Sequence, residues 1–104
     1  MSKVQEIALI EVRQSDEFNA WLLKLRDSNA RSKILVRILR LRHGNPGDTR
    51  SIGNGIVEMK IDYGPDYRVY FIRKGEAIVV LLCGGDKSTQ PKDILRAKEL
   101  ALDA

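Results

Sequence analysis

Apolar residues in the first half of the chain recur at helical spacing. A first stripe consists of Phe18, Trp21, Leu22 and Leu25. Because Ser15 precedes it as a candidate N-cap and acidic residues follow directly, this stripe predicts an amphipathic helix. A second stripe consists of Ile34, Leu35, Ile38, Leu39 and Leu41. It follows capping residues at 27–29 and ends at Gly44, so we expect a helical hairpin whose apolar sides face a core.

The remaining apolar runs have the character of strands. They cover residues 4–12, 56–63, 67–74 and 77–83. The first contains two glutamates, as an edge or half-exposed strand allows, and the last is almost continuously apolar, which is typical of a central strand. Glycine-containing turns between the last three runs predict an antiparallel meander. A final helix begins near Pro91, with Thr89 or Gln90 as its cap, and continues toward the C-terminus.

Length and composition limit the class of protein. A chain of 104 residues with 43% hydrophobic and 31% charged residues is typical of one ordinary folded domain, here residues 1–104. No apolar run approaches the roughly 18 residues of a membrane span. The N-terminus lacks the apolar region of a signal peptide, and the single cysteine, Cys83, cannot form an internal disulfide. We therefore expect a cytoplasmic protein with no membrane role.

The net charge of +4 is concentrated in one segment. Residues 31–50 carry six lysines and arginines against the single acid Asp48, whereas the rest of the chain is close to balanced. A concentrated basic segment attracts phosphates or an acidic protein partner. We expect RNA contacts from this segment, while a solvated helix face is the structural alternative. The arginines concerned are Arg31, Arg37, Arg40 and Arg50.

Strand alternation places three further cations on one sheet. If the face of 56–63 that contains Met59 packs under the helical hairpin, Lys60 must point to the opposite face. Arg68 shares that face if Val69 and its alternate neighbours point inward. Lys87 follows a glycine pair at the end of the next strand. The sequence thus predicts a shallow basic surface on the side of the sheet that the helices leave uncovered.

This surface has a functional and a structural interpretation. Tyr70 alternates onto the same face and would be available to stack on a base, and aromatic faces beside phosphate-binding cations suit single-stranded RNA. Cross-strand ion pairs of Lys60 and Arg68 with Glu58 and Asp62 are the structural alternative.

Four segments closely resemble the addiction-module killer proteins, toxins of the RelE/HigB-type branch of the RelE/ParE superfamily. They are Trp21-Leu-Leu-Lys-Leu-Arg-Asp, Gly44-Asn-Pro-Gly-Asp, Tyr63-Gly-Pro-Asp-Tyr-Arg-Val-Tyr-Phe and Gly84-Gly-Asp-Lys-Ser-Thr-Gln. The resemblance covers nearly the whole chain. It implies an α+β fold, in which two N-terminal helices pack on an antiparallel-rich twisted sheet and a C-terminal helix follows. It also implies a toxin that cleaves messenger RNA, usually in the ribosomal decoding site, and a cognate helix-turn-helix antitoxin that neutralises it.

The resemblance also assigns candidate catalytic residues. It places Lys60 and Arg68 at the family's basic strand positions and Lys87 at its cation after the last strand. Metal-free RNA cleavage requires removal of the 2′-hydroxyl proton, stabilisation of the phosphorane and protonation of the departing 5′-oxygen. Arg68 suits the second task, because its guanidinium stays charged and can hold two phosphate oxygens. Either lysine could be acid or base only if neighbouring cations depress its pKa. We expect no metal and no cofactor.

The chain departs from better-known members of the family on the C-terminal helix. Several relatives place a tyrosine or histidine there, but the comparable stretch here is Lys92-Asp93-Ile94. A carboxylate at Asp93 or Asp86 beside three cations should stay ionised and donate no proton. The acid and base are therefore left open, and one hypothesis is that ribosomal RNA supplies part of the chemistry.

Two other functions are compatible with the same residues. A ParE-like inhibitor of DNA gyrase has the same fold and would use the basic helix to dock a protein, and an RNA-binding module would lack catalysis. Other residues that often carry chemistry are expected to be structural. His43 suits the end of a helix dipole, Trp21 belongs to an apolar stripe, and Cys83 lies in the most apolar strand.

Overall fold

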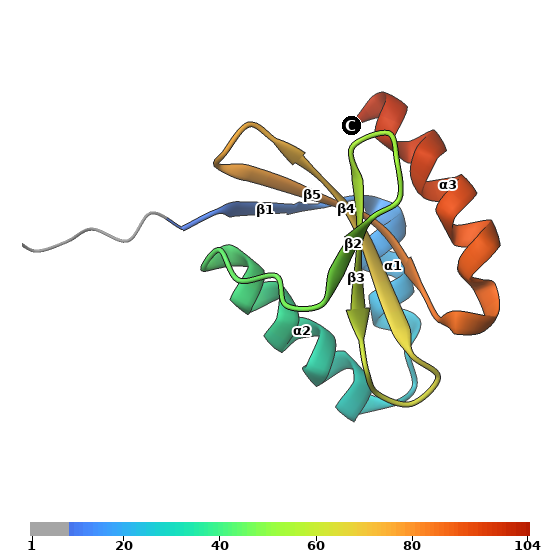
Figure 1. Ribbon diagram of the computed structural model, residues 1–104. Coiled ribbons are helices and arrows are strands. Elements are labelled where there is room, and N and C mark those ends of the chain that lie inside the picture. The colour runs from blue at the N-terminus through green and yellow to red at the C-terminus, as the bar shows by residue number, and fades with distance from the viewer. Residues whose placement is uncertain (1–8) are drawn as a thin grey trace, which may run out of the picture.

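The computed structural model describes residues 9–104, in which one five-stranded sheet is combined with three α-helices (Figure 1). In chain order the elements are β1 (Glu11–Gln14), α1 (Asp16–Lys24), α2 (Ser28–Arg42), β2 (Thr49–Ser51), β3 (Ile56–Ile61), β4 (Tyr67–Lys74), β5 (Ile78–Gly85), the 3₁₀ turn η1 (Lys87–Thr89) and α3 (Gln90–Asp103). This arrangement confirms the predicted α+β fold class. None of the helices in this part of the chain is long and apolar enough to cross a membrane.

The strands are arranged in the order β1-β5-β4-β3-β2. β3, β4 and β5 form the predicted antiparallel meander, while β1 pairs in parallel with β5 at one edge. β5 is an interior strand as expected, although β4 takes the middle position. Much of the strand predicted over residues 4–12 lies outside the described residues, and β1 begins at Glu11. The edge strand β2 was not predicted, because three polar residues carry no alternation of apolar side chains.

The predicted capping residues begin and end the helices. The Ser15 hydroxyl accepts a hydrogen bond from the backbone N–H of Phe18 at 3.0 Å, and the Asp27 carboxylate accepts from Asn29 at 2.9 Å. Both satisfy backbone donors that a helix start leaves unpaired. After α2, Gly44 adopts the left-handed conformation with a φ of 82°, which glycine reaches without steric cost.

Helices cover both faces of the sheet. Under α1 and α2, Phe18, Leu22 and Ile34 pack on Met59 and Phe71 of the strands. A second cluster lies on the opposite face under α3, where Ala97 packs with residues such as Ile56, Tyr70 and Leu82. The prediction of an uncovered second face was therefore wrong, because the amphipathic α3 buries a large part of it.

A β-bulge in β5 sets the positions of two adjacent glycines. Tyr70 pairs with Cys83 but Phe71 pairs with Leu81, so β5 gains one residue relative to β4. As a result Gly84 lies against the indole of Trp21 in α1, and Gly85 lies against the Asp93 carboxylate of α3 on the other face. A methyl group at either position would overlap the neighbouring side chain. The glycine pair thus lets helices approach β5 from both sides.

The contact between Gly84 and Trp21 predicts a specific stability effect. Gly84→Ala should lower the free energy of unfolding by about 1–3 kcal/mol, the usual cost of overpacking a core. Combined with Trp21→Leu, which removes the colliding ring, the alanine should cost less than it does alone. Urea unfolding of the two single variants and the double variant measures this coupling. Strictly additive effects would show that the collision is not the cause.

Candidate functional site

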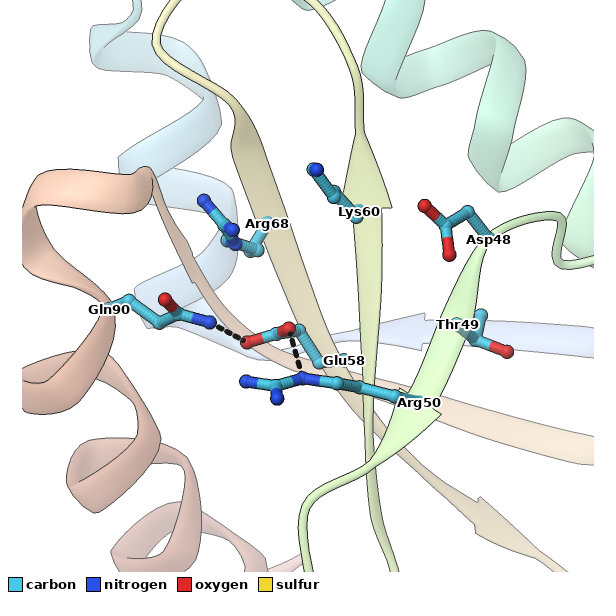
Figure 2. A pocket seen from close by; sticks show the side chains of 7 residues that line it. All are labelled: Asp48, Thr49, Arg50, Glu58, Lys60, Arg68 and Gln90. Atoms are coloured by element: carbon cyan, nitrogen blue, oxygen red, sulfur yellow. Dashed lines mark hydrogen bonds and ion pairs between the residues drawn. The ribbon is translucent and has the colours of Figure 1, made fainter.

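Lys60 of β3 and Arg68 of β4 are direct cross-strand partners and lie on the same face of the sheet. Both side chains enter a polar pocket of about 320 Å³, with Gln90 of α3 on one side and the β2 edge on the other (Figure 2). The complete lining is Asp48, Thr49, Arg50, Glu58, Lys60, Arg68 and Gln90. Strand alternation therefore located these two cations correctly. We call this cavity the cation pocket.

Arg68 is the most buried cation of the pocket, with 7% of its surface exposed. One guanidinium nitrogen, Nη1, donates to the backbone carbonyl of Asp66 at 2.9 Å. The buried Nε has no hydrogen-bond partner in the structure. Because an unpaired buried N–H costs free energy, this group favours an additional acceptor in the pocket.

No carboxylate forms an ion pair with Lys60 or Arg68 within residues 9–104. The alternative in which they pair with Glu58 and Asp62 is therefore not what the structure shows. Both cations leave their charge available to a ligand. A polyanion bound in the pocket would meet two adjacent positive groups at short range.

Glu58 pairs with other residues at the base of the cation pocket. Its carboxylate accepts hydrogen bonds from Arg50 Nε at 2.8 Å and from Gln90 Nε2 at 2.9 Å (Figure 2). Burial by itself would raise the pKa of Glu58, but these hydrogen bonds outweigh it and hold the pKa below its ordinary value. The ionised carboxylate thus joins the β2 edge to α3 across the floor of the pocket.

Tyr70 does not reach a ligand. Its side chain is fully buried under α3, so the prediction that it stacks on a base was wrong. Burial next to the Glu58 carboxylate raises the pKa of the phenol. By geometry, the buried hydroxyl has no hydrogen-bond partner among residues 9–104. The period of two had placed Tyr70 on the correct face, but the position of α3 decides that this part of the face is core.

Lys87 lies beside the cation pocket rather than in its lining. It begins η1 two residues after Gly85, the strand partner of Arg68, and its backbone N–H donates to the Pro65 carbonyl at 3.2 Å. The exposed side chain is thus held near the β3–β4 turn. Of the three predicted catalytic cations, Lys60 and Arg68 lie together in the pocket, and Lys87 lies just after the end of β5.

The arginines of residues 31–50 have different environments. Arg37 donates from Nη1 to the Lys60 carbonyl at 2.6 Å and from Nη2 to the Pro46 carbonyl at 2.8 Å, and burial lowers its pKa. Arg31 donates to the Leu25 carbonyl. Both side chains are half-buried and hold neighbouring loops through these hydrogen bonds. The prediction of RNA contacts had assumed that their guanidinium groups are free in solvent. Arg50 lines the cation pocket, and Arg40 is exposed on α2.

The two acidic residues considered as proton donors are used in caps and in packing. Asp86 accepts the backbone N–H of Ser88 at 2.8 Å and so caps η1. Asp93 accepts the Thr89 hydroxyl, and burial raises the pKa of Asp93, contrary to the expectation that cations would keep it low. Neither residue lines the cation pocket. The proton-transfer groups therefore stay unassigned among these residues.

Three residues that were predicted to be structural lie outside the lining of the cation pocket. His43 Nδ1 lies 2.9 Å from the Leu39 carbonyl at the end of α2. Trp21 packs edge-on against Tyr67 at the border of the first core cluster, with ring centroids 6.3 Å apart. Burial raises the pKa of the Cys83 thiol to about 12, which favours the protonated form over the thiolate.

Local sequence patterns indicate the rest of the pocket only in part. Glu58 shares the face of Lys60 at a spacing of two, but its role as an anchor depends on Arg50 and Gln90 coming near it. Gln90 was predicted only as a possible helix cap. Asp48 and Thr49 enter the lining because β2 pairs with β3, which no local pattern indicates.

Comparison with known proteins connects this architecture to described families. In the crystal structure of the toxin–antitoxin complex RelBE2 from Mycobacterium tuberculosis, one chain matches 80% of this chain and 97% of its own length, with a TM-score of 0.51 and 16% identity. At that identity the match shows the fold. An uncharacterised protein of Haemophilus influenzae is 50% identical over 92 residues, which are 88% of this chain and 93% of that protein. The model of the phage-derived Gp49-like proteins matches residues 20–103, and the chain belongs to this family.

Proposed function

We propose that this protein is the toxin of a toxin–antitoxin pair and that it cleaves messenger RNA without a metal ion, on the ribosome. One observation carries the proposal: Lys60 and Arg68 meet across two strands in a polar pocket, and no carboxylate of residues 9–104 forms an ion pair with either. The fold shared with a chain of a toxin–antitoxin complex supports the biological setting.

The geometry suits stabilisation of a phosphorane. In the proposed reaction the 2′-oxygen attacks the adjacent phosphorus, the bond from phosphorus to the 5′-oxygen breaks, and a 2′,3′-cyclic phosphate and a 5′-hydroxyl form. Charge accumulates on the non-bridging oxygens during attack. Arg68 would bind these oxygens through its fork, because its Nε has no partner and its buried position is already fixed by the Asp66 carbonyl. Lys60, directly opposite, would add the second positive charge.

The remaining cations would bind the flanking RNA. Lys87 projects at the end of β5, and Arg50 reaches the pocket from the β2 edge, where Glu58 fixes its direction. A strand of RNA crossing from η1 to β2 would pass Lys87, the two pocket cations and Arg50 in turn. Such contacts neutralise phosphates and contribute affinity without reading sequence.

The pocket offers few groups that could act as the acid or the base of the reaction. Glu58 has a lowered pKa and is engaged by two donors, so it cannot serve as an acid near neutral pH. The Tyr70 phenol is buried with a raised pKa. Lys60 could take part, and we propose that ribosomal RNA provides the missing group, which makes the ribosome a participant in the reaction.

Loss of Arg68 should strongly reduce cleavage. We expect Arg68→Ala to reduce cleavage about 100-fold or more, as removal of one transition-state donor typically does, and Arg68→Lys to restore only part because it keeps the charge but loses the fork. Primer extension on message from expressing cells reads cleavage as new 5′ ends. Lys74→Ala is the matched control, since Lys74 is an exposed cation of the same strand outside the pocket.

Primer extension separates the competing functions when it is combined with assays of gyrase supercoiling and of RNA binding. A folded Arg68→Ala variant that cuts as well as the parent would refute the assignment of Arg68, and melting curves establish that it is folded. If the parent chain inhibits supercoiling by DNA gyrase and yields no new 5′ ends, the ParE-like function is correct. Binding of RNA without new ends identifies a non-catalytic module.

Cleavage should depend on the ribosome. Purified protein is expected to cut a message bound in the decoding site of isolated ribosomes at least about 100-fold faster than the same message free in solution, because positioning and a proton-transfer group both come from the ribosome. Single-turnover rates on the two substrates test this. Equal rates would show that the chain contains a complete active site.

A further inference from the structure

The outward side of α2 carries an apolar strip that the fold leaves exposed. The inward side, which includes Ile34 and Ile38, is buried in the core, but about half of the surface of three large apolar residues remains in contact with water. The exposed fractions are 49% for Leu35, 53% for Val36 and 52% for Leu39. Residues at this spacing are neighbours on a helix surface and form one strip. Single exposed apolar residues are common, but a contiguous group indicates a binding surface.

A groove of about 410 Å³ runs beside this strip, between α2 and the end of β3. Val36 belongs to both the strip and the groove, and Ile61 contributes a nearly buried side chain. The rest of the lining is Ser32, Lys33, Arg37, Arg40 and Asp62. We call the strip and the groove together the α2 surface. It offers apolar contacts with a basic border, in which Asp62 is the single acid.

The basic border has no acidic partner within residues 9–104. Neither Lys33 nor Arg40 forms an ion pair there, and Lys33 Nζ lies 5.1 Å from the centre of the Tyr63 ring. The excess of basic residues in this chain is concentrated at 31–50. A complementary ligand would therefore carry negative charge on both sides of an apolar stripe.

We infer that the α2 surface docks an acidic amphipathic helix of the antitoxin, an inference that rests on the proposed function. A helix laid along α2 would place apolar residues three and four positions apart on Leu35, Val36 and Leu39, and its acidic residues would reach Lys33 and Arg40. RNA fits this surface less well, because phosphates and sugars give three half-exposed aliphatic side chains no apolar partner. The α2 surface is thus a protein-binding site, in contrast to the cation pocket.

The two surfaces can be tested separately, because they are formed on opposite faces of the sheet. α2 covers the face that contains Met59, whereas Lys60 and Arg68 point to the face of α3. Arg37 is the residue that contacts both regions, since it lines the groove and donates to the Lys60 carbonyl. Substitutions at Val36 and Leu39 should therefore weaken docking and leave cleavage unchanged.

The probe is a fluorescent helical peptide of about 20 residues, roughly 30 Å long, with leucines at helical spacing between glutamates. A matched peptide has lysine in place of each glutamate. Fluorescence anisotropy with the full chain should show binding of the acidic peptide only. Val36→Glu combined with Leu39→Glu should weaken binding at least about 10-fold. Leu95→Glu is the control, because Leu95 is an exposed leucine of α3 with more of its surface in water than Val36 or Leu39.

Amide chemical shifts on peptide addition should change along α2. The proposal is overturned if the acidic peptide does not bind, if both peptides bind equally, or if Leu95→Glu weakens binding as much as the α2 variant. It is also overturned if single-stranded RNA displaces the peptide and shifts the same α2 amides, or if sedimentation shows that a second copy occupies the surface. Message cleavage by the α2 variant is measured in parallel, so a failure of the proposed ribonuclease function is distinguishable from a failure of docking.

Discussion

The contact of α3 with β5 at Gly85 is the constraint on which the candidate site depends. Because Gly85 has no side chain, the Asp93 carboxylate and the first turn of α3 lie directly on the sheet. This brings Gln90 next to Glu58 and closes one side of the cation pocket, while β2 closes the other. Arg68, paired with Gly85 on the neighbouring strand, is buried by the same approach. A larger residue at position 85 would move α3 outward and open the pocket.

Burial of polar groups beside one another gives the pocket its electrostatic character. Glu58 is almost inaccessible to water, yet two donors keep it ionised, and its charge is used within the protein. Arg68 is nearly as buried, but the one hydrogen bond that its side chain forms within the described residues is to a neutral carbonyl. Attraction between charges is stronger where water is excluded, so an anion at Arg68 would be bound more firmly than at an exposed arginine. Glu58 is a structural charge because the protein supplies its hydrogen-bond donors, whereas Arg68 can act on a ligand because the described residues supply no anion to pair with it.

Much of this arrangement could be predicted from local sequence, and the rest depends on tertiary contacts. The boundaries of β4 and the common face of Lys60 and Arg68 follow from a side-chain period of two. Ser15 and Asp27 were identifiable as caps from their residue type. Nothing local indicates that α3 covers Tyr70, that β5 contains a bulge, or that three polar residues form β2. These features arise when elements distant in sequence pack together, which propensity and periodicity do not report.

The distribution of charge along the sequence located the basic segment, but it did not show which groups the arginines of that segment contact. The segment 31–50 is basic, but Arg31 and Arg37 donate hydrogen bonds to backbone carbonyls and so hold neighbouring loops in place.

Arg37 donates to the carbonyl of Lys60 on one side and to that of Pro46, before β2, on the other. It therefore determines the backbone positions on which the cation pocket is built, while its guanidinium also lines the groove beside α2. In the part of the chain that the structure describes, the Arg37 Nε is buried without a partner, so an acidic group entering the groove would compete with the carbonyls for this side chain. Arg37 thus contacts both the groove of the α2 surface and the backbone of Lys60, although the two sites lie on opposite faces of the sheet.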